Sequence, residues 1–306
     1  MEHFISILST PTERLVAMLR RAISLRTRPE TVLAGKTLCC VFEKPSLRTR
    51  VSFEQAARRL GGMAMTLSQN EVGIGSRETP EDIARVLSGM VDAIMVRVMA
   101  HETLERMAAV SEVPLINGLS DLAHPAQALA DALTLVDEFS PGNPMGLKGL
   151  EVAFVGDGNN VARSLCVICG ELGMKFTICS PPGYELDEGW IAGLKAKMPG
   201  LEYRSCTDPV EAVLHADAVY CDTFVSMGQE EEQVKRLSVF GRYQVNSELM
   251  MQAPAKAIVM HCLPAHRGVE ITSEVMDGPR SRVFRQAHNR LDAQMGLLAE
   301  LMGKRA

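Results

Sequence analysis

The chain has 306 residues, of which 46% are hydrophobic and 23% are charged, an ordinary globular composition. Its length suits two domains of about 140 residues each. The net charge of -5 excludes a general nucleic-acid or membrane-surface binder, and an aromatic content of 5% is too low for a base-stacking platform.

Predicted strands and helices alternate along the first half of the chain. A helix is expected over 4–27, with an internal start signal at 10–13. Strands follow at 37–42, 64–67, 93–96 and 114–117, and helices at 50–61, 80–90, 101–109 and 124–138. This alternation is typical of a parallel α/β sheet. The turn-rich residues 140–146 predict a linker.

The second half restarts the same alternation. A strand is expected at 150–155, a tight turn at 156–160 and a helix at 161–172, with further strands at 175–179, 218–221 and 257–260 and a last helix over 281–302. We therefore expect an α/β protein with two doubly wound parallel sheets and flanking helices. Its domains would span 1–139 and 148–280, and residues 281–306 would pack back on the first domain.

No apolar run is long enough to span a membrane, and no basic segment precedes an apolar one at the N-terminus. These features predict a cytoplasmic protein whose eight cysteines are reduced thiols. Cys166 and Cys169 have the spacing of a redox or zinc half-site. Because no second pair lies at ligand spacing, core packing is the favoured interpretation.

Residues 46–50 place two hydroxyls and two guanidiniums between an apolar strand and a helix. Backbone N–H groups and the helix dipole attract anions at such a junction. Arg48 adds forked donors suited to phosphate, and Ser46 and Thr49 add hydroxyls. The alternative is an N-capped surface helix with scattered arginines.

Two further segments carry polar side chains at helix starts or strand ends. His124 and Gln127 share one face at a helix start and can donate to one small ligand, although a capping His and a solvated Gln are the alternative. Asp222 follows a strand, at the edge where ligands bind in open α/β sheets, and could pair with an ammonium. Ser226 and Met227 follow it and could close over an aliphatic stem.

Three other positions invite a cofactor or an anion. The Gly-x-Gly turn at 156–158 suggests a dinucleotide site, but the third glycine is replaced by Val161, so Asn160 holding a carboxylate is favoured. His261 and Cys262 suggest a metal, but no other ligand falls at a fitting spacing, and a thiol near a cationic amine is the better interpretation. Arg290 lies on the apolar side of the last helix, which is unusual unless it meets an anion.

Together these segments resemble the aspartate/ornithine carbamoyltransferase family over nearly the whole chain. Residues 46–50 are similar to its carbamoyl phosphate motif and 124–127 to its His-Pro-x-Gln. Residues 156–160, 222–228 and 261–268 resemble the ornithine branch. The resemblance implies transfer of a carbamoyl group from carbamoyl phosphate to the δ-amine of ornithine, with no cofactor or metal. It also implies a homotrimer or a higher assembly of trimers.

The resemblance also implies a set of site residues. Those for carbamoyl phosphate are Ser46, Leu47, Arg48, Thr49, Arg97, His124, Gln127, Cys262, Leu263 and Arg290. Those for ornithine are Asn160, Asp222, Ser226 and Met227. The catalytic residues would be Arg97, His124, Asp222 and Cys262.

The chain departs from the family pattern at two positions. Leu47 stands where the family has a threonine, and Gly73 stands where it places a glutamine that reaches into the neighbouring subunit. Two rival functions stay open. One is a putrescine carbamoyltransferase, which has no α-carboxylate to bind, and the other is a catalytically silent relative that acts by binding.

Overall fold

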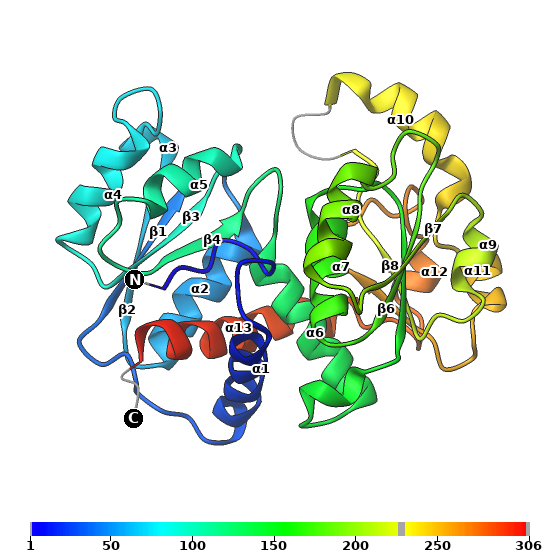
Figure 1. Ribbon diagram of the computed structural model, residues 1–306, viewed down its shortest axis with the longest axis horizontal. Coiled ribbons are helices and arrows are strands. Elements are labelled where there is room, and N and C mark those ends of the chain that lie inside the picture. Colours follow the sequence, from blue (N-terminus) through cyan, green and yellow to red (C-terminus); the bar gives the residue numbers. More distant parts are fainter. Residues whose placement is uncertain (1, 226–229, 304–306) are drawn as a thin grey trace. The chain divides into compact units, whose positions relative to one another are not determined.

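The computed structural model describes residues 2–225 and 230–303 (Figure 1). The chain divides into two compact units, which we call the first and the second unit. The first unit comprises residues 1–144 and 288–306, and the second comprises residues 145–287. Within the described ranges, no helix has both the length and the apolar character needed to cross a bilayer.

The first unit is built on a parallel sheet with the strand order β2-β1-β3-β4. Its strands are β1 (Thr37–Phe42), β2 (Met63–Ser68), β3 (Ala93–Arg97) and β4 (Leu115–Leu119). Its helices are α1 (Thr12–Thr27), α2 (Leu47–Arg59), α3 (Gln69–Val72), α4 (Pro80–Ser88), α5 (His101–Ala108) and α6 (Pro125–Phe139). Strands β1 and β3 are central and buried almost throughout, whereas β2 lies at the edge and is largely exposed. A core that includes Ile94, Leu104 and Met107 lies between the sheet and its helices.

The first helix begins later than the sequence predicts. Residue Phe4 forms a bridge to β4, because its N–H donates to Leu115 O and its carbonyl accepts from Asn117 N, both at 2.8 Å. These bonds satisfy the backbone at the sheet edge, and Pro11 then holds an extended conformation at the N-cap of α1. The prediction of a helix from residue 4 is therefore wrong for residues 4–11.

The second unit contains a parallel sheet with the order β7-β6-β5-β8-β9. Its strands are β5 (Glu151–Val155), β6 (Lys175–Cys179), β7 (Glu202–Cys206), β8 (Ala218–Cys221) and β9 (Ile258–His261). Its α-helices are α7 (Asn160–Glu171), α8 (Glu188–Lys197), α9 (Pro209–Val213), α10 (Gln233–Phe240), α11 (Ser247–Gln252) and α12 (Ser273–Met276). Short 3-10 turns lie at Pro144–Leu147, Glu230–Glu232 and Gly241–Tyr243. Strand β7 was not expected, because this polar edge strand has no apolar run.

The last helix, α13 (Val283–Met302), begins in the second unit and ends in the first. Its later part packs in the first unit, where Asp292 accepts from Arg26 Nε at 2.6 Å and Asn289 donates to Thr134 Oγ1 at 3.0 Å. The expected return of the C-terminal helix to the first domain is confirmed, as are the two parallel α/β sheets.

All eight cysteines lie within the described residues, and all are free thiols. Cys166 and Cys169 are both buried on α7. The prediction of core packing for this pair is confirmed.

Candidate active site

The polar residues of the first unit gather at a switch point of its sheet. The chain continues from β1 to β2 on one side, while β3 lies on the other side of β1, so the crossovers part between β1 and β3. Phe42 at the end of β1 pairs in register with Arg97 at the end of β3. Ligands bind in open α/β sheets at such a point, beyond the carboxyl ends of the strands.

The N-terminus of α2 follows β1 directly. Ser46 is its N-cap: the hydroxyl accepts from Thr49 N at 3.4 Å and donates to Thr49 Oγ1 at 3.1 Å. Leu47 is the first helical residue and its side chain is 75% exposed. It therefore brings a backbone N–H, and not its side chain, to the first turn, where such groups attract anions.

Arg290 on α13 joins this turn to α6 within the first unit. Its Nη2 donates to Thr49 Oγ1 and its Nη1 to Gln127 Oε1, each at 2.9 Å. Gln127 in turn donates to Asp131 Oδ1 at 2.8 Å. All four side chains are buried, so the hydrogen bonds fix their orientations without competition from water.

His124, the N-cap residue of α6, is surrounded by positive charge. Burial lowers its pKa well below the usual value, and the guanidiniums of Arg290, Arg97 and Arg48 lower it further. The imidazole is therefore neutral near neutral pH. Three guanidiniums that act on one buried ring make a strongly positive site suited to a multiply charged anion. The first-unit cluster thus comprises Ser46, Arg48, Thr49, Arg97, His124, Gln127 and Arg290.

The second unit has its own switch point, between β5 and β8. Asp222 follows β8, and its Oδ2 accepts from Asn159 Nδ2 at 2.8 Å. Its other oxygen, Oδ1, accepts from Cys262 Sγ at 3.0 Å. Asn159 also caps α7, because its Oδ1 accepts from Val161 N and Ala162 N at 2.9 and 3.1 Å. Asp222 is therefore buried and held by two donors.

The loop after β9 is fixed by a buried carboxylate. Leu263 N donates to His261 Nδ1 at 2.8 Å, which leaves Nε2 as the protonated nitrogen facing Glu270 Oε1 at 3.2 Å. The same oxygen accepts from His266 N at 2.5 Å. Leu263 holds a φ of 60° and is followed by a cis peptide bond to Pro264. These contacts set the direction in which Cys262 and the Leu263 carbonyl point.

Asp222, His261 and Cys262 form the one group of possible metal ligands found among the described residues, with ligand atoms within 4.8 Å of one another. Both ring nitrogens of His261 already take part in hydrogen bonds, and both Asp222 oxygens accept one. The group therefore has an internal hydrogen-bonding role that needs no ion.

The structure brings most predicted site residues together in two groups. The first-unit cluster holds seven of them, with Leu47 beside it. Asp222, Cys262, Leu263 and Asn160 belong to the second unit, Asn160 as the first residue of α7. Ser226 and Met227 lie outside the described residues.

Sequence reasoning missed Asn159 and Glu270. The local signal for Asn159 was present, since asparagine is favoured at an N-cap and residue 159 precedes the helix. For Glu270 there was none, because its contact to His261 depends on the fold of the loop.

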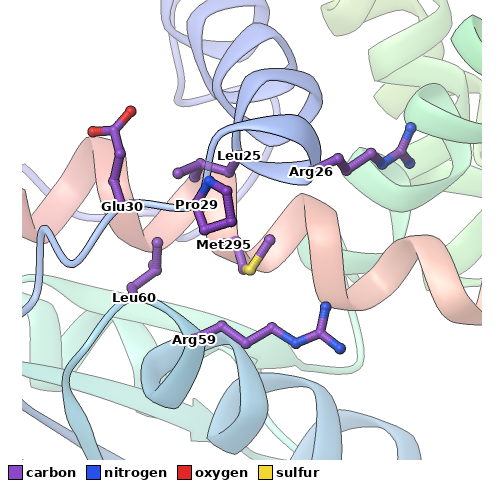
Figure 2. Close-up of a pocket in the computed structure, with 7 residues that line it drawn as sticks. All are labelled: Leu25, Arg26, Pro29, Glu30, Arg59, Leu60 and Met295. Atoms are coloured by element: carbon purple, nitrogen blue, oxygen red, sulfur yellow. The ribbon is translucent and has the colours of Figure 1, made fainter.

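A separate hollow of about 260 Å³ lies in the first unit, between the end of α1, the end of α2 and α13 (Figure 2). Leu25, Leu60 and Met295 form part of its lining. Arg26, also at its rim, is already bound to Asp137 and Asp292. None of the predicted site residues lines this hollow.

The model of the aspartate/ornithine carbamoyltransferase carbamoyl-P binding domain matches residues 2–137, and that of the Asp/Orn binding domain matches residues 148–301. Ornithine carbamoyltransferase of Bacillus subtilis is 48% identical over 295 residues, 95% of this chain and 91% of the relative. That of Methanopyrus kandleri is 48% identical over 309 residues, 98% of this chain and 97% of the relative.

Solved structures of similar proteins match the fold of this chain over nearly its whole length. Ornithine carbamoyltransferase from Pyrococcus furiosus superimposes with a TM-score of 0.94 at 42% identity, covering 100% of this chain and 98% of that one. An acetylornithine transcarbamylase complexed with acetylcitrulline has a TM-score of 0.89 at 29% identity, covering 99% and 100%.

Proposed function

The chain belongs to the aspartate/ornithine carbamoyltransferase family, and we propose that it transfers the carbamoyl group of carbamoyl phosphate to the δ-amine of L-ornithine, giving L-citrulline and phosphate. The resemblance predicted from the sequence is thereby confirmed. The observation that carries the chemistry is the buried group in which Arg290 donates to both Thr49 and Gln127, beside a His124 ring whose pKa is lowered by burial and by Arg290, Arg97 and Arg48.

The first-unit cluster would bind carbamoyl phosphate. Ser46, Thr49 and Arg48, with the backbone N–H of Leu47, would hold the phosphate at the N-terminus of α2. Arg290 and Gln127 complete the binding group, because Arg290 is fixed to both Thr49 and Gln127.

The same cluster would stabilise the transition state. When the amine attacks the carbamoyl carbon, negative charge develops on the carbonyl oxygen, and Thr49, Arg97 and His124 are the donors for it. A neutral His124 donates through a single N–H and does not have to lose a proton. Removal of one such donor costs about 2.7–4 kcal/mol of transition-state stabilisation.

The second unit would bind the acceptor amino acid. Asp222 provides a carboxylate for the α-ammonium, and its orientation is set by Asn159 and Cys262. Asn160 would bind the α-carboxylate through its amide. Cys262 and the carbonyl of Leu263 would face the δ-amine, and the roles of Ser226 and Met227 are proposed from the family resemblance.

A homotrimer, or a higher assembly of trimers, is part of the proposal. The first unit exposes apolar side chains on two neighbouring elements. These are Leu47 and Val51 on α2, and Met63 and Met65 on the edge strand β2. Apolar groups beside a sheet edge favour contact with another chain. Sedimentation velocity of Met63→Lys/Met65→Lys should show a smaller species, while Met251→Lys, at an exposed position of α11 in the second unit, should not.

We also propose a cytoplasmic location, supported by eight free thiols.

Product formation with three acceptors tests the function. Carbamoyl phosphate is supplied with ornithine, putrescine or N-acetylornithine, and the carbamylated product is measured. Ornithine should be the preferred acceptor. Equal use of putrescine would contradict the carboxylate-binding role of Asn160, and no product with any acceptor would favour a catalytically silent binding protein.

A further inference from the structure

The second unit contains a buried ion pair that the proposed reaction does not use. Arg236 on α10 is 3% exposed, and its Nη2 lies 2.7 Å from Asp157 Oδ2. The guanidinium carbon lies 5.0 Å from the ring centroid of Tyr184 and 5.7 Å from that of Phe240. Desolvation of two charges offsets most of their attraction, so such a pair is weak evidence for stability alone. Its place in the fold points to another role.

Asp157 begins the turn that carries the acceptor-side asparagines. It lies two residues after β5, and Asn159, two residues further on, donates to Asp222. Between them, Gly158 packs against backbone: a Cβ at this position would lie 2.6 Å from the carbonyl carbon of Glu185. The turn is therefore fixed on one side by this close approach and at Asp157 by Arg236.

Arg236 also offsets the negative charge of the carboxylates around Asp157. Burial raises the pKa of Asp157 to about 6, against the lowering effect of Arg236, and the nearby carboxylates of Asp222 and Glu232 raise it too. Asp157 and Asp222 are thus neighbouring acids that repel each other when both are ionised. Loss of Arg236 would leave this repulsion uncompensated and would displace the turn that carries Asn159.

We infer that Arg236 is a positioning residue for Asp222. By pairing with Asp157 and fixing the turn at 156–159, it keeps Asn159 directed at Asp222 and so holds the Asp222 carboxylate in the orientation that would meet the α-ammonium of the acceptor. Arg236 acts through Asp157 and Asn159 and touches no substrate. The inference rests on the proposed function, since it takes Asp222 as the partner of the ammonium.

Steady-state kinetics of Arg236→Gln, with each substrate varied in turn, tests this role. The KM for ornithine should rise by about tenfold or more, while the KM for carbamoyl phosphate stays within about twofold. Arg242→Gln is the matched control, because Arg242 is exposed and follows α10 closely; both KM values should stay within about twofold. Equal rises in both KM values for Arg236→Gln would show general loosening and overturn the inference.

A charge-relief variant sharpens the test. Asp157→Asn in the Arg236→Gln background removes the carboxylate that Arg236 neutralises, and should return the KM for ornithine to within about threefold of the unchanged protein. No recovery would overturn the inference. Arg236→Lys keeps the positive charge but loses the forked donors of the guanidinium. It should raise the KM for ornithine less than Arg236→Gln does, again with little change in the KM for carbamoyl phosphate. This variant keeps the test available even if Arg236→Gln does not fold.

A failure of the proposed function can be distinguished from a failure of this inference about Arg236. If the unchanged protein forms no citrulline, the proposed function fails and this inference with it. If it forms citrulline but the Arg236 variants show no KM split, only the inference is wrong.

Discussion

Arg290 donates a 2.9 Å hydrogen bond to Thr49 Oγ1, although the two residues are 241 positions apart in the chain. Thr49 Oγ1 also accepts a hydrogen bond from the Ser46 hydroxyl. The guanidinium of the last helix is therefore connected to the first turn of α2. The other bond from Arg290 goes to the amide oxygen of Gln127. Both of these acceptors are uncharged, so the two hydrogen bonds orient the guanidinium without neutralising it.

Arg48→Ala should abolish or strongly weaken carbamoyl phosphate binding and leave the fold intact. A hydrogen bond to a charged group contributes about 1.5–3 kcal/mol, so the affinity should fall by about tenfold or more. Titration calorimetry measures the affinity, and circular dichroism checks the fold.

Arg50→Ala is the matched control for Arg48→Ala. Arg50 is exposed and pairs with Glu54 at 2.9 Å, so its loss should change the affinity by less than about twofold. An unchanged affinity in Arg48→Ala, or equal losses in both variants, would count against the phosphate role of this turn.

The pH dependence of stability should report the buried imidazole. The pKa of His124 in the folded state lies below its unfolded value of 6.5, so the folded protein binds fewer protons than the unfolded chain below that pH. The contribution of His124 to the free energy of unfolding is fully present above about pH 6.5. It falls as the pH decreases, by up to about 1.4 kcal/mol per pH unit.

The variant His124→Gln lacks this titrating group and serves as the reference for the unchanged protein. The difference in unfolding free energy between the unchanged protein and His124→Gln, from urea unfolding between pH 7.5 and 5.5, should shrink as pH falls. Asp157, whose pKa is raised to about 6, contributes in the opposite direction, but equally in both proteins. A constant difference across this range would contradict a depressed pKa for His124.

The rate at low ornithine should rise with pH. The δ-amine of ornithine has a pKa close to that of lysine, about 10.4, and only its neutral form attacks the carbamoyl carbon. The kcat/KM for ornithine should therefore increase by close to tenfold per pH unit at the lower pH values. A flat kcat/KM between pH 6 and 9 would contradict attack by an amine that must first lose its proton.

Local motifs explain what the sequence could predict. Ser46, Arg48 and Thr49 lie within four positions, and the strand before them and the helix after them are strongly patterned. Position at a strand end then placed Arg97 and Asp222 at the ligand-binding edges of their sheets. The alternation of apolar strands and helices was enough to predict both sheets.

Contacts between distant segments explain what the sequence could not predict. Asn159, not Asn160, orients Asp222, and this depends on a strand end 63 positions away. Arg236 meets Asp157 across 79 positions with no local pattern to announce it. Similarly, residues 4–11 have a helical pattern, but Phe4 pairs instead with β4, 112 positions later in the chain.

Gly73 and Gly75 form a matched pair for testing the loop in which the family resemblance implies a departure from the family pattern. Both have positive φ, +66° and +74°, which an alanine adopts at a cost of about 1–2 kcal/mol. A Cβ at Gly73 would also lie 2.6 Å from the Cβ of Arg77, whereas one at Gly75 would meet nothing within 4 Å. Gly73→Ala should therefore cost more stability than Gly75→Ala, by about 1–3 kcal/mol for the overpacked contact.

The contact with Arg77 can be removed separately. Arg77→Gly deletes the Cβ that a side chain at position 73 would meet, so in this background Gly73→Ala and Gly75→Ala should cost about the same, as judged by urea unfolding. Equal costs in the unchanged background would show that the loop shifts freely and that Arg77 does not restrict position 73. The expected inequality would show that Arg77 occupies the space into which a Cβ at position 73 would project.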